Sequence, residues 1–164
     1  MALGDQYFAA SEAINLGAAT ALVTLDVAIT AANRRISINE IGVSFNGTSA
    51  AAVPVIVRLV RTTTAPVGGG TITQAATPVD NASPASLCTA YMPTTATPGT
   101  YATTPPTVGV ILRTWYVSPT SGLIVQFPLG QEPDSPSTPA ASGFGIQCNA
   151  PAAVAVSTYL VWTE

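Results

Sequence analysis

Histidine and lysine are absent from this chain of 164 residues, and charged residues make up only 8% of it. Without these two side chains, the bases that activate the nucleophile in Ser-His-Asp, Cys-His and Ser-Lys enzymes are missing. The two cysteines, Cys88 and Cys148, lie far apart in the sequence, which excludes the ordinary Cys/His zinc site. These absences predict a protein that is not an enzyme and that needs neither a metal nor a cofactor.

Carboxylates are the chemical groups that remain, and their placement favours a structural role. Glu132 and Asp134 share one phase in a proline-rich loop, and a glycosidase would hold such a pair about 5–9.5 Å apart beside a groove. The loop has no aromatic residue next to the pair, so we interpret both as solvated acids. Calcium could bind them or Asp80 through loop carbonyls, but the spacing of a calcium loop is lacking. The glycines at 68–70 precede neither Lys-Ser/Thr nor a helix and indicate a tight turn.

The charge pattern argues against nucleic acid and membranes as partners. The net charge is −3, and the arginines form only two local groups, Arg34 with Arg35 and Arg58 with Arg61, whereas nucleic-acid binding depends on clustered positive charge. No apolar stretch approaches the roughly 18 residues of a membrane span, and residues 1–16 lack the features of a secretory signal. So few charges suit a surface packed against copies of itself or a larger assembly. A neutral surface that reflects coding bias is the alternative.

Apolar residues recur at every second position, which predicts a β-protein. Residues 21–30, 53–61 and 154–164 each alternate in this way. The composition is rich in Ala, Val, Thr, Ser, Gly and Pro, which favours strands and turns. About eight strands separated by turns, with no credible helix, form the pattern of a sandwich or jelly roll. We therefore predict an all-β, single-domain antiparallel β-sandwich or jelly roll, and the length agrees with one domain.

Two segments depart from this regular pattern. Residues 1–20 have no clear period, so we interpret them as an N-terminal arm or a lead-in strand. The neighbouring aromatics Tyr7 and Phe8 indicate that the arm docks on the protein's own core or on a neighbour. Within the sandwich domain, residues 21–164, the stretch 62–107 is rich in Thr, Pro and Ala. We interpret it as a long ordered excursion with about two short strands, lying on the surface or on a neighbour.

One predicted strand changes phase halfway along. The apolar residues of 36–38 and those of 41–45 have opposite parity, with Asn39 and Glu40 between them. One extra residue at this point would restore the phase, which is what a β-bulge supplies. We predict a bulge at Asn39–Glu40 that bends the strand.

The predicted strand at 144–150 contains the second cysteine. Cys148 shares its apolar phase with Phe144 and Ile146. We expect a buried free thiol at Cys148, and the sequence leaves open whether it meets Cys88 in a disulfide.

The predicted strand at 108–117 is apolar on both phases, which indicates a central strand or one that crosses an interface. Arg113 shares a phase with Ile111 and Trp115, so it is either an exposed residue stacked on Trp115 or an interface anchor. A receptor- or sugar-binding surface would need exposed aromatics, for which the candidates are Tyr91, Tyr101, Trp115 and Tyr116. The full set of interface candidates is Tyr7, Phe8, Arg58, Arg61, Tyr91, Tyr101, Arg113, Trp115 and Tyr116.

Three long stretches form a familiar combination: ISINEIGVSFNGTSAAAVPVIVRLVR, LRTWYVSPTSGLIVQFPLGQE and GFGIQCNAPAAVAVSTYLVWTE. Over residues 20–164 the chain resembles a group of small jelly-roll virion structural proteins of tailed bacteriophages and prophages, which include capsid decoration (cement) subunits. The strongest pieces are EIGVSFNGT, WYVSPTSGL, PLGQE and the final APAAV…YLVW strand. None of them is a catalytic motif, and no functional residue is carried over from the family.

The resemblance implies a structural virion protein. Its expected role is that of a capsid decoration subunit which binds and stabilises the major capsid shell through its arm and loops. Its partners would be the major capsid protein and further copies of itself, as a dimer or trimer. It would be made in the host cytoplasm and reside on the capsid surface. The alternative is a receptor- or carbohydrate-binding knob or fibre module of a virion.

Overall fold

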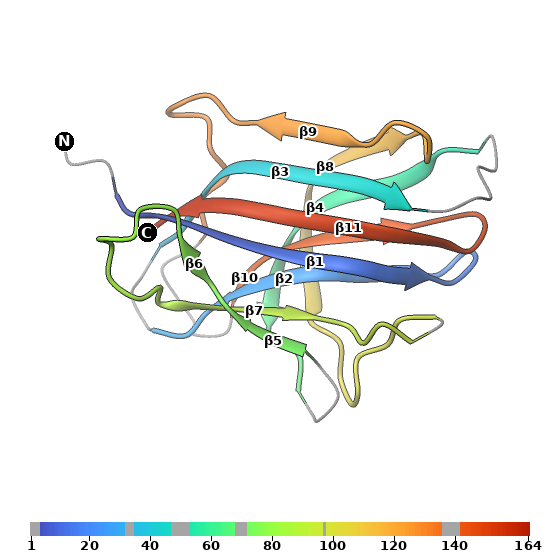
Figure 1. Ribbon diagram of the computed structural model, residues 1–164, viewed down its shortest axis with the longest axis horizontal. Coiled ribbons are helices and arrows are strands. Elements are labelled where there is room, and N and C mark those ends of the chain that lie inside the picture. The colour runs from blue at the N-terminus through green and yellow to red at the C-terminus, as the bar shows by residue number, and fades with distance from the viewer. Residues whose placement is uncertain (1–3, 32–34, 47–52, 68–71, 97, 136–141) are drawn as a thin grey trace.

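Two antiparallel β-sheets face each other and enclose the core (Figure 1). The computed structural model describes residues 4–31, 35–46, 53–67, 72–96, 98–135 and 142–164. The five-stranded sheet has the order β6 (Thr77–Pro78), β1 (Gln6–Leu16), β11 (Val154–Thr163), β3 (Ser37–Asn46) and β9 (Leu123–Gln126). The six-stranded sheet has the order β5 (Ile72–Ala75), β7 (Cys88–Met92), β2 (Ala21–Ile29), β10 (Gly143–Asn149), β4 (Val55–Thr64) and β8 (Thr107–Val117). No helix occurs in the described ranges, so the prediction of an all-β antiparallel sandwich is confirmed.

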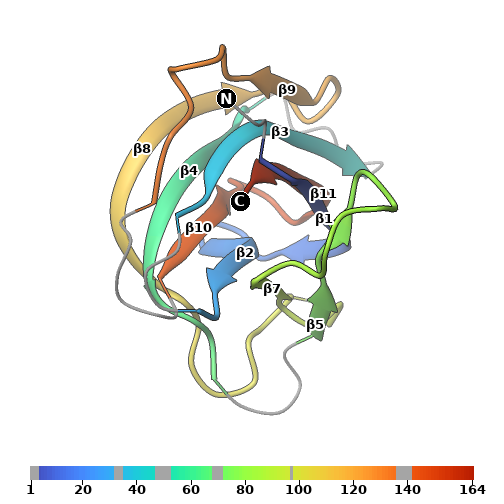
Figure 2. The same ribbon diagram turned by 90° about the vertical axis from the view of Figure 1, so that its left-hand side faces the viewer.

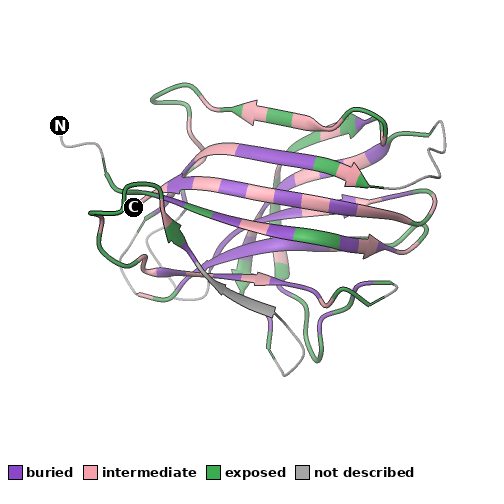
Figure 3. Cartoon of the chain, viewed as in Figure 1, coloured by how far each residue is buried: buried purple, intermediate pink, exposed green. Residues whose placement is uncertain are grey.

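The core lies between the sheets because the strands turn their apolar phase inward, as the banding of β11 in Figure 3 illustrates. In β11, Val156, Leu160 and Trp162 are fully buried. The residues that alternate with the last two, Tyr159, Val161 and Thr163, are half-exposed. Trp162 stacks on Tyr7 of β1, with 6.1 Å between ring centroids. Burial of one large aliphatic side chain stabilises a fold by about 1.5–3 kcal/mol, so this inner layer is the main source of stability.

β3 contains the bulge that the sequence predicts. Val161 of β11 pairs with Glu40, and the next residue, Trp162, pairs with Ile38, so Asn39 is the extra residue. The apolar side chains on both sides of the bulge stay buried. The change of phase in the sequence is therefore what keeps both halves of this strand facing the core.

The segment predicted to be an N-terminal arm is in large part a strand of the body. β1 lies between β6 and β11 in the five-stranded sheet, and Tyr7 is only 1% exposed. The alternation of inward residues along β1 is not visible in the sequence, because the pairing of β1 with β11 shifts between Ser11 and Ile14. This shift changes the parity of the inward residues. Of the two interpretations of residues 1–20, the lead-in strand docked on the protein's own core therefore holds for residues 6–16, and the projecting arm does not.

The excursion at 62–107 contributes strands to both sheets. Its described part holds three short strands, β5, β6 and β7, where about two were expected. β7 pairs with β2 and β5, and β6 pairs with β1. The chain after β7 lies against β2, where the Tyr101 hydroxyl donates a hydrogen bond to the Val23 carbonyl at 2.8 Å.

β8 is the edge strand of the six-stranded sheet, which corrects the expectation of a central strand (Figure 2). It pairs with β4, and the register shifts at three points along the pair. Most of its residues are exposed on both phases. Apolar residues on both phases are typical of a strand buried on two sides, but here Val110, Ile111 and Tyr116 are exposed, whereas Trp115 and Val117 pack against the core.

The six-stranded sheet also buries a carboxyl group, that of Asp26 in β2. Asp26 is fully buried, its Oδ1 accepts a hydrogen bond from the Thr62 hydroxyl at 2.8 Å, and its Oδ2 has no partner. Because burial disfavours the charged form, the pKa of Asp26 rises from 3.8 to about 7.

Both cysteines are buried free thiols. The prediction of a buried free thiol at Cys148 is confirmed, and no disulfide joins Cys148 to Cys88.

Candidate functional site

Two of the candidate interface tyrosines are buried inside the protein. Tyr7 donates its hydroxyl to the Pro84 carbonyl at 3.0 Å, and Tyr101 is 9% exposed with its hydroxyl on Val23. A buried tyrosine hydroxyl requires such a partner, and here each partner is a main-chain carbonyl far away in the sequence. Their assignment to an exposed interface is therefore wrong.

The two candidate arginines of β4 bind partners within the chain. The Arg61 guanidinium lies 6.0 Å from the centroid of the Phe144 ring and donates to the main-chain carbonyl of Asp134. Arg58 Nη1 donates to the Gln147 side-chain oxygen at 3.1 Å. Both arginines are half-buried, and their contacts hold β4 to its neighbours. Arg34, named with Arg35 as a basic pair, lies outside the described residues.

The remaining candidates lie in three different places. Phe8 is partly exposed on the outer face of β1, and Tyr91 is half-buried in β7. Arg113 is exposed and Tyr116 is 73% exposed on β8, whereas Trp115 is half-buried against the core. Only the three residues of β8 are neighbours, and Tyr116 lies on the opposite phase of the strand from Arg113 and Trp115.

β8 and β9 end the two sheets on the same side of the sandwich (Figure 2). Large apolar residues are exposed on this side. We call it the β8–β9 side and define it by four residues whose exposed fractions range from 49% to 87%: Val110, Ile111, Tyr116 and Leu129. Arg113 is the single charged residue within 107–131. Edge strands of soluble proteins usually carry several charges or a cover, and exposed apolar patches mark interaction sites. The β8–β9 side is a candidate contact surface for another protein.

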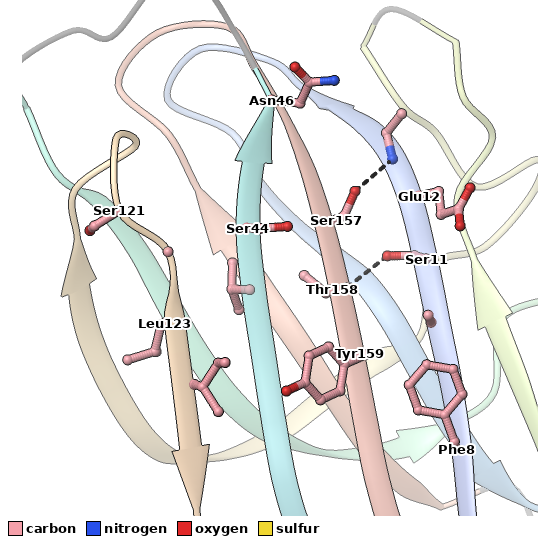
Figure 4. Close-up of a pocket in the computed structure, with 15 residues that line it drawn as sticks. Phe8, Ser11, Glu12, Ser44, Asn46, Ser121, Leu123, Ser157, Thr158 and Tyr159 are labelled. Carbon is pink, nitrogen blue, oxygen red and sulfur yellow. Dashed lines mark hydrogen bonds between the residues drawn. The ribbon is translucent and has the colours of Figure 1, made fainter.

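A second candidate site is a groove of about 820 Å³ on the outer face of the five-stranded sheet (Figure 4). β1, β11, β3 and β9 run beneath it, and the side chains of Ser44 and Ser157 along its centre are short. The turn before β9, with Ser121, borders it on one side, and the bulge of β1, with Ala13, borders it on the other. The groove exists because small side chains line the middle of the sheet, while the turn before β9 and the bulge of β1 rise above the sheet on its two sides.

Two aromatic rings close one end of the groove. Tyr159 of β11 lies over Gly42 of β3, where a Cβ atom would come within 1.9 Å of the tyrosine Cε1. Phe8 lies beside it, with 5.9 Å between ring centroids and 40° between ring planes. In a view onto the sheet both rings are seen nearly face-on (Figure 4). Only a glycine at 42 lets the Tyr159 ring lie flat against the backbone and present its other face to solvent.

Hydrogen bonds to Glu40 hold the Tyr159 ring in place. The Glu40 carboxylate accepts from the Tyr159 hydroxyl and, at 2.7 Å, from the side-chain amide of Gln126 in β9. These two bonds lower the pKa of Glu40, so its carboxylate is charged at neutral pH. Desolvation, followed by the contact with Glu40, raises the pKa of Tyr159 to about 12, so its hydroxyl keeps its proton and remains the donor.

Backbone strain occurs at the opposite border of the groove. Ala13, in the bulge of β1, has a φ of 51°, and its amide donates to the Ser157 hydroxyl at 3.2 Å. Beneath it, the buried hydroxyls of Ser11 and Thr158 are 2.7 Å apart. A non-glycine residue in this conformation is costly and is found most often at functional sites.

The loop acids singled out in the sequence each have local partners. Glu132 accepts from the Gly130 amide at 2.5 Å, Asp80 accepts from the Ala82 amide at 2.9 Å, and Asp134 accepts from the Ser37 hydroxyl. Among the described residues no group of three His, Cys, Asp or Glu side chains is placed to hold a metal ion. The glycines at 68–70 lie outside the described residues.

Sequence reasoning named Phe8 but missed Tyr159 and Glu40. The available signal was that Tyr159 occupies the opposite phase to Leu160 and Trp162, so an aromatic residue had to face outward. That it meets Phe8 required the pairing of β1 with β11.

Comparison of the chain with models of protein families, with curated proteins and with solved structures found no match. In the described part of the chain, no helix has the length and apolar character needed to cross a membrane.

Proposed function

We propose that this protein is a structural subunit of a tailed-bacteriophage virion, a capsid decoration protein that docks on the major capsid shell and associates with its own copies. The observation that carries the proposal is the exposed, nearly uncharged β8–β9 side. The sequence resemblance to small virion proteins supports the same role.

The order in which the strands pair supports a jelly-roll form of the sandwich. Apart from the three strands of the excursion, the first described strand pairs with the last (β1 with β11), then β2 with β10, β3 with β9 and β4 with β8. One long antiparallel ribbon wound around itself produces this nested order. It places β1-β11-β3-β9 opposite β2-β10-β4-β8. Jelly rolls of this kind occur in viral capsid domains and in lectins.

β8 is long enough to contribute to a protein contact surface. A strand of 11 residues such as β8 spans about 36 Å, and a stable interface buries about 800 Å² on each partner. Tyr116 belongs to the residue types that dominate binding hot spots. The register shifts along β8 and the charge of Arg113 disfavour open-ended strand pairing, so we place the contact on the side chains of β8 rather than on its backbone edge.

Shell binding can be tested by co-sedimentation with empty shells assembled from the major capsid protein encoded in the same genome. The unmodified protein should sediment with the shells, and the double variant Ile111→Lys/Tyr116→Lys should stay in the supernatant. Val79→Lys is the matched control, because Val79 is 60% exposed and lies away from β8 and β9. A protein that never sediments with shells, or a double variant that binds as well as the control, would refute the proposal.

A further inference from the structure

We propose that the groove on the outer face of the five-stranded sheet is a binding site for a neutral saccharide. The groove reaches β9, but none of the four residues that define the β8–β9 side lines it, so this inference goes beyond the proposed virion role. Its volume of about 820 Å³ falls in the range of pockets that hold small organic ligands, about 300–1,000 Å³.

The aromatic end of the groove offers a stacking surface. One face of the Tyr159 ring is covered by the backbone at Gly42, and the Phe8 ring lies beside it at 5.9 Å. The open face of an aromatic ring is electron-rich, and the C–H groups on one side of a hexose ring carry a weak positive charge. Sugar rings therefore stack on such a surface. The hydrogen bond from Tyr159 to Glu40 fixes this surface before any ligand arrives, which reduces the entropy lost on binding.

The rest of the groove offers hydroxyl and amide groups beside the apolar side chains of Val43, Leu123 and Ile124. Ser44, Ser121 and Asn46 line it, and the Ser44 hydroxyl points toward its middle in Figure 4. Ser157 accepts from the Ala13 amide, so its own hydroxyl hydrogen remains available as a donor. Hydroxyl side chains both donate and accept, as the hydroxyl groups of a saccharide do. A purely apolar ligand would leave these groups without partners, which costs binding free energy.

The charges around the groove exclude an anionic ligand. Glu12 is the single charged residue among the described residues that line it. The Glu40 carboxylate, which accepts the hydrogen bond from the Tyr159 hydroxyl, adds a second negative charge next to this ring. With two negative charges and no arginine nearby, an acidic sugar or a phosphate would be repelled. An uncharged molecule with one apolar face and many hydroxyls matches every side of the groove.

A printed array of neutral hexose and N-acetylhexosamine oligosaccharides identifies a bound sequence, and titration calorimetry with that oligosaccharide then measures its affinity. We expect saturable binding that Tyr159→Ala weakens by about tenfold or more. Gly42→Ala should weaken binding as well, because the added methyl group lifts the ring away from the sheet. Tyr116→Ala is the matched control, since it removes a more exposed tyrosine from the other sheet and should leave the affinity unchanged.

Thermal unfolding of each variant shows whether it is folded, and Phe8→Ala replaces Tyr159→Ala should the latter not fold. No binding to any neutral oligosaccharide overturns the inference, and so does a groove variant that binds as well as the Tyr116→Ala control. Loss of saccharide binding in Tyr159→Ala with retained sedimentation on capsid shells would show that the two sites act independently. The double variant Ile111→Lys/Tyr116→Lys should show the opposite result: it should lose binding to shells and keep its affinity for the saccharide.

Discussion

Replacing Asp26 with asparagine removes the buried carboxyl group from the six-stranded sheet with almost no change of shape. Asp26 is fully buried, with Thr62 as the hydrogen-bond donor to Oδ1 and no partner for Oδ2. The asparagine oxygen can still accept from Thr62, but the side chain has no charged form. The variant therefore isolates the effect of ionising this group inside the protein.

The pKa of Asp26 sets both the sign and the size of the effect. Burial raises the pKa from 3.8 in the unfolded chain to about 7 in the folded protein, so between these values the folded state binds more protons than the unfolded state. The contribution of Asp26 to stability is fully present below pH 3.8 and is lost as the pH rises through about 7. At about 1.4 kcal/mol for each pH unit, the total loss is about 4 kcal/mol.

Urea unfolding followed by circular dichroism at several pH values from acid to mildly alkaline measures this contribution. The free energy of unfolding of the unmodified protein should fall, relative to that of Asp26→Asn, by up to about 4 kcal/mol over this range. Other groups, such as Glu40 with its lowered pKa, titrate alike in both proteins and cancel in the difference. Parallel curves for Asp26→Asn and the unmodified protein would refute the buried, uncharged state of Asp26.

Two further predictions concern the groove. Ala13→Gly should raise the free energy of unfolding, measured by urea unfolding, by about 1 kcal/mol, because glycine adopts the φ of 51° without strain. The control Ala10→Gly, in the same strand, should instead lower the free energy of unfolding. Equal losses at both positions would contradict the strain at Ala13. Gly42→Ala should destabilise by about 1–3 kcal/mol, because its Cβ would come within 1.9 Å of the Tyr159 ring. In the double variant Gly42→Ala/Tyr159→Ala the second change should recover most of that loss, and simple additivity in this cycle would show that the ring does not lie on Gly42.

Local patterns in the sequence were sufficient for much of the fold. Alternation with period two predicted the strands, because side chains on a strand point to opposite faces. The bulge at Asn39 was predictable because a change of parity between two apolar runs is visible without knowing the partner strand. β1 escaped detection for a related reason: its bulge lies between Ser11 and Ile14, and few large apolar residues mark its parity there.

The candidate site was less accessible from the sequence. Tyr159 could be read as outward-facing, but its neighbours on the sheet, Gly42 and Phe8, belong to strands at the other end of the chain. A ring that lies flat on the backbone depends on a glycine directly across the strand pair, and strand pairing is a tertiary property. The apolar residues of β8 were equally ambiguous, since a central strand and an exposed edge strand have the same composition.

By itself the sequence determined that the chain forms antiparallel sheets around an aliphatic core and that it lacks the usual catalytic bases, because both follow from residue identity and short-range order. Only the tertiary structure decided which strand became an edge, which carboxyl group was buried away from water beside Thr62, and which small residues opened a groove. These outcomes depend on which distant segments pack together, and the alternation of side chains along one strand does not encode its partners.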